Sequence, residues 1–333
     1  MRRQYPGWSW ITAIVIVSMF GFVFVGCSER GAMPTAPPTA QHSSSASLMA
    51  SQADPPRERV PENKPKETVD YCTTIIPFSS ARFSNPRRIN HPYSPMVPGL
   101  QYTLTGEANR GLGVKPHDVV FTVTDVVKVI NGIECVVLWD RDFQEDPANP
   151  GTKILAEVEL AFFAQDDAGN VWMMGEYPEE FDITNGGEFQ GAPNTWIPGI
   201  AGTEAGTLII GDTKNGSGYY LQARAPSIRF LDCARILGTE VNCVPVGCFN
   251  NVLVTDERAP ADWRGGHQRK YYAPGVGNIR VDFRGDPEGE VLVMSSRKQL
   301  NAAELAAVRA EVLRLDARGF QFNDVYAQTA PAR

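Results

Sequence analysis

Two runs of apolar, β-branched residues separated by Asn131-Gly132 constrain the fold of this chain most. The first run covers residues 119–130 and ends at that dipeptide, and the second covers residues 133–139. Both residues of a two-residue hairpin turn must accept positive φ, which asparagine and glycine do most readily. The pattern therefore predicts two long antiparallel strands joined by a tight turn.

The same pattern recurs further along the chain. Residues 155–164 lead into 165–170, a turn rich in Asp, Gly and Asn, and the chain returns through 171–174. Further strand candidates are 207–210, 219–223, 246–255, 269–272, 278–283 and 290–295. Because no crossover helices separate these strands, we expect a mainly β fold, either a large curved antiparallel sheet or an open barrel of hairpins.

One α-helix is expected at the C-terminal end. Asn301 and Glu304 have the spacing of a capping box, and Gly319 is a plausible helix stop. An apolar stripe at helical spacing consists of Leu305, Val308, Val312 and Leu315. We expect this stripe to pack on the sheet, and a helix that binds a partner protein is the alternative.

The N-terminus has the organisation of a bacterial lipoprotein. After a short cationic start, residues 8–25 form an apolar run that ends at a cysteine. The sequence Phe24-Val25-Gly26-Cys27 resembles the lipobox, in which the cysteine is acylated and becomes the new N-terminus. We therefore expect Cys27 to carry a lipid anchor, and an uncleaved transmembrane helix is the alternative.

Composition divides the chain into four parts. Residues 1–26 are the expected signal peptide, and 27–69 are the lipidated cysteine and a Pro-, Ser- and Ala-rich tether that cannot bury enough apolar surface to fold. Residues 70–300 form the β-rich domain, and 301–333 the C-terminal helix and tail. This organisation predicts a lipid-anchored protein of the cell envelope, at the outer membrane if the organism has one.

The net charge limits the partners of the domain. The chain carries −7, and removal of Arg2 and Arg3 with the signal peptide would change this to −9. An acidic domain repels phosphate, so we expect no nucleic-acid partner. The expected partners are the membrane, through the acyl anchor, and a lipid, a glycan or an envelope protein.

Export permits disulfide bonds among the remaining cysteines. Cys135 lies among Val and Leu residues in a predicted strand, where a free thiol behaves as a small hydrophobic group. The other four allow three pairings, of which a local Cys243–Cys248 bridge and a Cys233–Cys243 bridge are attractive. These four candidates are Cys72, Cys233, Cys243 and Cys248.

An acidic segment after the first hairpin is a candidate cation site. Asp140, Asp142 and Asp146 could direct carboxylate oxygens at one Ca²⁺ ion, although the segment lacks the full pattern of an EF-hand loop. A solvated strand end is the alternative, and no other cofactor is expected.

Catalytic motifs are sparse. The sequence contains no HExxH and no GxSxG motif. His267 could pair with Asp256 or Glu257 as a base and its orienting group, and a solvated loop histidine is the alternative reading. Catalysis is therefore not the leading expectation.

Aromatic residues are plentiful in the predicted strands. Half of them would face one side of a curved sheet, where they form either an ordinary core or an apolar groove for lipid or glycan. The candidate groove residues are Trp139, Trp172, Trp196, Tyr271 and Tyr272.

Several short segments resemble a known family. They are HPYSPMVPG at 91–99, GIECVV at 132–137, AQDDAGNVWMMGE at 164–176, FNNVLVT at 249–255 and KYYAPGVG at 270–277. In this order they are similar to the motifs of a family of uncharacterised secreted bacterial β-rich proteins and lipoproteins, with NPYxPLxPG, AQDxxGNVWxxGE and KYYAPGVG-like signatures. The resemblance implies an exported β-rich domain and supplies no catalytic residues.

Two functions remain open at this point. The leading hypothesis is a non-catalytic, membrane-tethered binding or envelope-scaffold domain of unknown ligand. The alternative is an extracellular hydrolase of a polysaccharide or other envelope polymer, with Glu176, Glu179 and Asp182 near a cleft. Glycoside cleavage would require two acids facing each other.

Overall fold

The computed structural model describes residue 72 and residues 76–214, 218–261, 266–285 and 288–333. The expected signal peptide, the lipidation site Cys27 and the tether lie outside the described residues. The β-rich part and the C-terminal helix both belong to the described residues.

Thirteen strands and one α-helix make up the described part of the chain. The helix is α1, Ala302–Phe322. The strands are β1 Leu100–Asn109, β2 Val114–Ile130, β3 Ile133–Glu145, β4 Lys153–Gln165, β5 Val171–Asp182, β6 Glu188–Gly191, β7 Glu204–Ile209, β8 Tyr220–Ala225, β9 Phe230–Val244, β10 Gly247–Ala259, β11 Gly266–Ala273, β12 Gly277–Phe283 and β13 Val291–Gln299. Short 3₁₀ turns lie at Phe78–Ser80, Ile183–Asn185, Pro226–Ile228 and Tyr326–Gln328.

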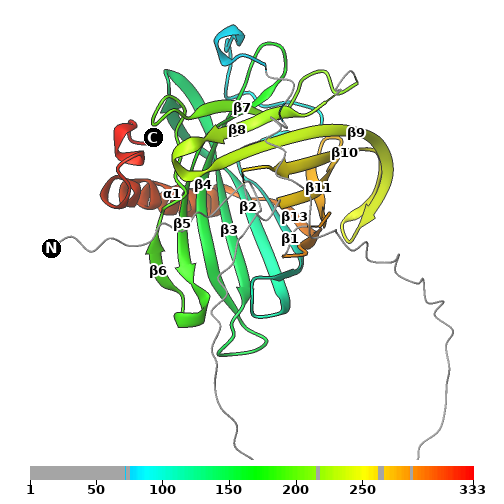
Figure 1. The fold of residues 1–333 in the computed structure, drawn as a ribbon, viewed down its shortest axis with the longest axis vertical. Helices are drawn as coiled ribbons and strands as arrows, with labels where there is room; N and C mark the ends of the chain where they lie inside the picture. Colours follow the sequence, from blue (N-terminus) through cyan, green and yellow to red (C-terminus); the bar gives the residue numbers. More distant parts are fainter. Residues whose placement is uncertain (1–71, 73–75, 215–217, 262–265, 286–287) are drawn as a thin grey trace, which may run out of the picture. The chain divides into compact units, whose positions relative to one another are not determined.

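The described strands form one antiparallel sheet that closes on itself. Their order is β4-β3-β2-β1-β13-β12-β11-β10-β9-β8-β7-β5, and β5 also pairs with β4. The short strand β6 adds to the edge of β5 outside this ring. Figure 1 shows the long strands β2 to β5 side by side and the strongly curved hairpin of β9 and β10. The prediction of a mainly β, antiparallel, curved fold is confirmed, and the closed ring removes the free sheet edges of an open barrel.

The first predicted hairpin forms as expected. Asn131 and Gly132 both have positive φ, at 51° and 78°, and they join β2 to β3. The strands β1 and β9 were not among the predicted strands. In β9, a stretch of mostly exposed residues runs from Leu237 to Val241, so its sequence lacks the apolar alternation of a half-buried strand.

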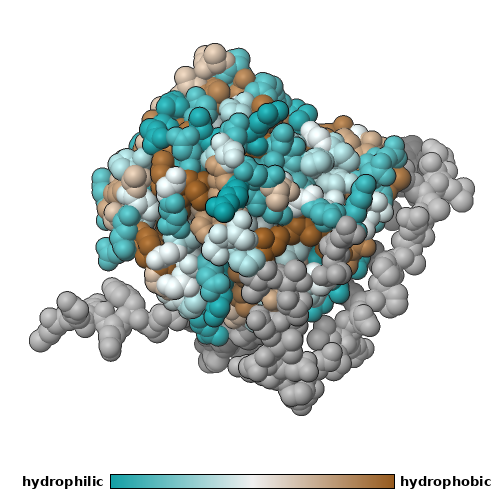
Figure 2. Space-filling view, turned by 90° about the horizontal axis from the view of Figure 1, so that it is seen from above, coloured by the Kyte–Doolittle hydropathy of each residue, from teal (hydrophilic) through white to brown (hydrophobic). Residues whose placement is uncertain are grey.

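The two faces of the sheet bury two separate apolar layers. The inner layer, inside the ring, includes Leu104, Phe121, Leu138 and Phe163. The outer layer covers β2 to β5 and includes α1, the C-terminal tail and residues 76–83. On the face seen in Figure 2, hydrophobic residues form small separate patches among hydrophilic ones.

The C-terminal helix packs on the outer face of the sheet, as predicted. Asn301 caps its N-terminus, and Glu304 completes the capping box. The predicted stop at Gly319 is wrong, because the helix continues to Phe322. Gly319 instead leaves room for the ring of Tyr326, which packs directly against its Cα. Among the described residues, no helix is both long and apolar enough to cross a membrane.

Candidate functional site

Segments that are far apart in the sequence meet at one end of the ring. The segment 91–97 lies against the turn between β11 and β12, where Gly275 donates a backbone hydrogen bond of 2.7 Å to the Pro92 carbonyl. The side chain of Gln165 holds the start of the segment by accepting hydrogen bonds of 2.9 Å from the backbone N–H groups of Asn90 and His91. Three of the motif segments, 91–99, 164–176 and 270–277, therefore build one end of the fold.

A small cavity lies beneath this junction, with a volume of about 40 Å³. Such a space holds a few water molecules or one small chemical group, and is well below the roughly 300–1,000 Å³ of drug-sized ligand pockets. Its polar wall contains Ser94, Tyr102, Lys270, Tyr272 and Asn278, and its apolar wall contains Met96, Phe121, Leu138, Phe163 and Leu208.

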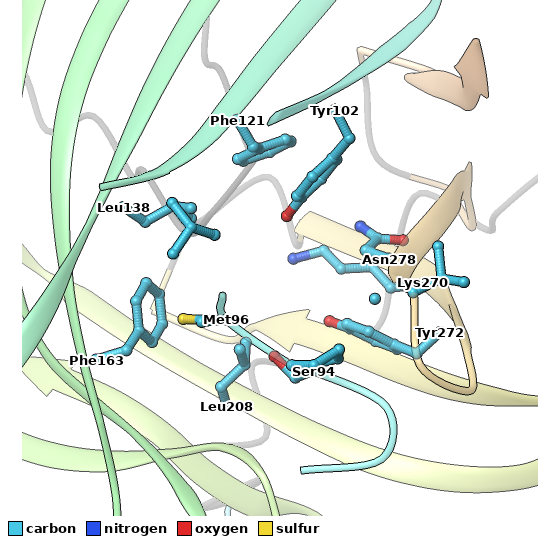
Figure 3. A pocket seen from close by; sticks show the side chains of 14 residues that line it. Ser94, Met96, Tyr102, Phe121, Leu138, Phe163, Leu208, Lys270, Tyr272 and Asn278 are labelled. Carbon is cyan, nitrogen blue, oxygen red and sulfur yellow. The ribbon is translucent and has the colours of Figure 1, made fainter. Parts of the chain in front are cut away.

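Figure 3 shows the two walls facing each other, with the Lys270 side chain reaching between Tyr102 and Tyr272. The Lys270 ammonium group lies 2.7 Å from a carboxylate oxygen of Glu257. Glu257 also accepts hydrogen bonds from Thr255 and Tyr272, at 2.9 and 3.2 Å. Lys270 is only 2% exposed, so this ammonium group is a fixed charge inside the ring.

Further along the interior, the inner face of β3 and β4 becomes acidic. Asp140 is directly opposite Glu159, and Asp142 is directly opposite Glu157. All four are at most 7% exposed. They share a face with Leu138, because side chains alternate along a strand and Leu138 belongs to the inner layer.

An arginine and a histidine lie near this acidic face. The Arg110 guanidinium contacts Asp142 with nitrogen–oxygen distances of 2.6 and 3.2 Å. His117 lies 3.6 Å from Asp142 and 3.4 Å from Glu290. Burial lowers the pKa of His117 to about 4, so the imidazole is neutral near pH 7 and adds no positive charge there.

Burial also raises the pKa values of the interior acids. It raises the pKa values of the Asp140, Glu157 and Glu159 carboxyl groups well above their usual range, and the neighbouring carboxylates raise them further. Burial raises the pKa of Glu176 as well, although its carboxylate accepts a hydrogen bond of 2.7 Å from the Trp196 indole.

The candidate groove aromatics do not form one surface. Trp172 is buried in the outer layer, where its indole donates to Asp166. Trp139 lies on the outer face of β3 with the Arg141 guanidinium 4.0 Å from its ring centroid. Trp196 stacks on Phe230 in the inner layer.

The two tyrosines of this predicted groove separate as well. Tyr272 lines the cavity, whereas Tyr271 is not one of its lining residues and donates a hydrogen bond to Asp282. The five aromatics therefore do not share one surface, because Trp139 and Trp172 lie in the outer layer. Trp196, Tyr271 and Tyr272 belong to the cluster of the inner layer.

The predicted calcium ligands do not converge. Asp140 and Asp142 point into the ring, whereas Asp146 lies in the exposed turn after β3 and accepts hydrogen bonds from Ala148 and Asn149. Within the described residues, no three His, Cys, Asp or Glu side chains are grouped so as to hold a metal ion.

The acids proposed for a hydrolase lie on opposite faces of β5. Glu176 faces the interior, whereas Glu179 lies under α1, 2.9 Å from the Arg318 guanidinium. Asp182 caps the turn at Ile183–Asn185. These three residues therefore do not form the facing pair that glycoside cleavage requires.

His267 and Asp256 do come into direct contact, as the sequence suggested. The Asp256 carboxylate also accepts hydrogen bonds from Tyr219 and Arg235, at 2.5 and 2.8 Å. A guanidinium group, an imidazole ring and a phenol surround the acid, which is the arrangement of a polar cluster near the surface. Glu257, the other partner considered for His267, faces the interior and binds Lys270.

The structure also resolves the choice of disulfide bonds. Cys72 is bonded to Cys233, and Cys243 to Cys248 across the turn between β9 and β10. Cys135 is a free, fully buried thiol.

Sequence reasoning missed most of the interior site. The sequence includes Lys270 in the motif at 270–277, whereas Tyr102 lies outside the predicted strands and site residues. The acids Glu157 and Glu159 alternate with outward-facing apolar residues in β4, and this period of two was the available signal. It was overlooked because acids at alternate positions normally face solvent.

Comparisons with known proteins do not assign the chain to a family. No family model matches it, and no curated protein matches it. Two solved structures are similar over 62% of this chain and 98% of their own. One, a protein assigned as exported with a YmcC-like fold from Bacteroides fragilis, is 14% identical with a TM-score of 0.36. The other, assigned as a lipoprotein from Parabacteroides distasonis, is 12% identical with a TM-score of 0.33.

Proposed function

We propose that this protein is a lipid-anchored binding protein of the cell envelope and that it acts without catalysis. The single observation that carries the binding role is the interior cavity, in which the fixed ammonium group of Lys270 and two tyrosines face an apolar wall. Specific binding sites combine apolar surface with a few placed polar groups in this way.

The motif segments support the same site. Residues 91–97 and the turn between β11 and β12 contribute to the cavity, and these are segments that resemble a family of secreted proteins. Loops positioned by a rigid scaffold commonly carry binding residues. A ligand of the size of a whole lipid would require these two segments to move apart, because the closed cavity is small.

Anchoring and export rest on the N-terminal sequence and on the cysteines. Phe24-Val25-Gly26-Cys27 resembles a lipobox, and two disulfide bonds suit an oxidising compartment outside the cytoplasm. An acyl anchor on Cys27 followed by a long tether would hold the domain near a membrane surface.

Native mass spectrometry of the full mature chain tests both parts of the proposal. We expect a mass increase for acyl groups on Cys27, lost in Cys27→Ala, and a retained small molecule when the protein is incubated with envelope lipids and glycans. Lys270→Met should weaken retention, whereas the exposed Lys298→Met should not. An unmodified Cys27 would contradict anchoring, and failure to retain any ligand would contradict binding.

A further inference from the structure

The interior acids are not balanced by positive charge. Arg110 pairs with Asp142, and Lys270 with Glu257. Asp140, Glu157 and Glu159 form no ion pair with any described residue, although each is at most 7% exposed. Glu176 also forms no ion pair with a described residue, but its carboxylate accepts a hydrogen bond from Trp196. Buried carboxylates are normally paired or carry a proton, since an isolated buried charge is costly.

Unpartnered polar atoms point to a ligand at this place. Both carboxylate oxygens of Glu159 and both amide atoms of Gln144 are buried without a hydrogen-bond partner among the described residues. Glu159 is 1% exposed and Gln144 is fully buried. Both alternate with the outward-facing residues of β4 and β3, so they point into the ring. Buried polar groups in folded proteins nearly always have partners, so a bound group with hydrogen-bond donors is the natural complement of the Glu159 carboxylate. Gln144 is four residues beyond Asp140 on β3 and lies outside this place.

Two residues that line the cavity are neighbours of this acidic face along the strands. Leu138 and Phe121 line the cavity, Asp140 follows Leu138 by two residues on the same face of β3, and Asp140 is directly opposite Phe121. A ligand with an apolar part in the cavity can therefore place a charged end among the acids. The ring of Phe121 can also face a cation.

We infer that the interior binds a small alkylammonium ligand, with its cationic nitrogen between Asp140 and Glu159 and its alkyl part against Leu138 and Phe121. The inference rests on the proposed binding function and names its ligand class. An ammonium group has three N–H donors for separate acceptors, which suits carboxylates spread over two strands. A metal ion needs converging ligands, and within the described residues no group of three acidic, His or Cys side chains provides them.

Isothermal titration calorimetry of the full mature chain tests the inference at pH 7.5 with n-butylamine. The neutral isostere n-butanol and CaCl₂ are titrated in parallel. We expect saturable binding of the amine, at least tenfold weaker binding of n-butanol, and no competition by Ca²⁺. Asp140→Asn and Glu159→Gln should each weaken amine binding at least tenfold, because each removes a charged acceptor. The matched control Glu107→Gln changes an exposed acid on β1 and should leave binding unchanged.

Three results would overturn the inference. Equal binding of n-butanol would show that charge plays no part, and Ca²⁺ binding abolished by Glu159→Gln would identify a metal site. Absence of saturable amine binding to the folded parent protein would show that protons alone neutralise the acids. If envelope ligands are retained through Lys270 while amines are not, the binding function stands and the ligand class fails.

Discussion

The two apolar layers of this protein bury charge in different ways. In the outer layer, the Lys128 ammonium lies 2.7 Å from Asp316, which also accepts hydrogen bonds from Tyr326 and the backbone of Ala332. Glu179 is likewise paired with Arg318. Inside the ring, several acids are buried to the same degree without a cationic partner. Matched pairs of this kind belong to a permanent core, whereas unmatched acids indicate an interior that takes up a cation or a proton.

The largest effect should come from breaking a matched pair in the outer layer. Asp316→Ala leaves the fully buried Lys128 ammonium without its carboxylate. We expect a loss of about 3–5 kcal/mol in the free energy of unfolding, because removal of one partner strands a buried charge. Urea denaturation measures the loss. The exposed pair Lys298–Glu304 provides the control, since Lys298→Met should cost less than about 0.5 kcal/mol.

The next largest loss of stability should come from disturbing the packing of the outer layer. Gly319→Ala places a methyl group against the Tyr326 ring, so we expect a loss of roughly 1–3 kcal/mol in the free energy of unfolding. The loss should shrink in the Tyr326→Leu background, where the ring is absent. A variant that is as stable as the parent would show that α1 packs on the sheet differently. Thermal or urea denaturation distinguishes these cases.

The pH dependence of stability tests Glu180 of β5, whose carboxylate accepts a hydrogen bond of 2.5 Å from Asn194. Burial raises the pKa of Glu180 to about 7, above its ordinary value of 4.5. Its contribution to stability is therefore complete below pH 4.5 and is lost as the pH rises through 7, by about 3 kcal/mol. Urea denaturation between pH 5 and 8 should show this decline, and Glu180→Gln should flatten it.

His117 should change stability with pH in the direction opposite to Glu180, because it destabilises the protein as the pH falls. Its pKa falls from 6.5 to about 4, so its contribution is complete above pH 6.5 and is lost as the pH falls to 4. His117→Gln should therefore reduce acid destabilisation. The two effects oppose each other between pH 4.5 and 6.5, so each is measured as the difference between the parent and its variant. A His117→Gln variant with the same loss of stability toward pH 4 as the parent would contradict the assignment of His117.

The smallest effect should come from neutralising an unmatched acid. Glu159→Gln should stabilise the ligand-free protein by roughly 1 kcal/mol at pH 8, because it removes a charge that has no partner. This is the reverse of the result for Asp316→Ala in the outer layer. Denaturation at pH 8 and pH 5 measures it, and the gain should be smaller at pH 5. A destabilised variant at both values would mean that the interior acids are paired like those of the outer layer.

Local sequence was sufficient to predict many of the turns, caps and strands of this fold. The Asn131-Gly132 turn and the capping box of Asn301 and Glu304 depend on backbone geometry within a few residues, so their chemistry is readable in advance. Alternating apolar residues predicted the antiparallel strands for the same reason. The strand β9 escaped prediction because the curvature of the closed ring leaves much of it exposed, and exposed residues carry no alternation.

The site was decided by tertiary structure. Asp140 and Glu159 are in different strands, and only the register of β3 against β4 makes them neighbours inside the ring. Cys72 and Cys233 are separated by 161 residues, and no local rule selects that pairing. Local sequence thus determines turns, caps and strand periodicity, because these depend on nearby backbone atoms. Closure of the sheet determines which polar residues are buried together, because that depends on pairings between distant strands.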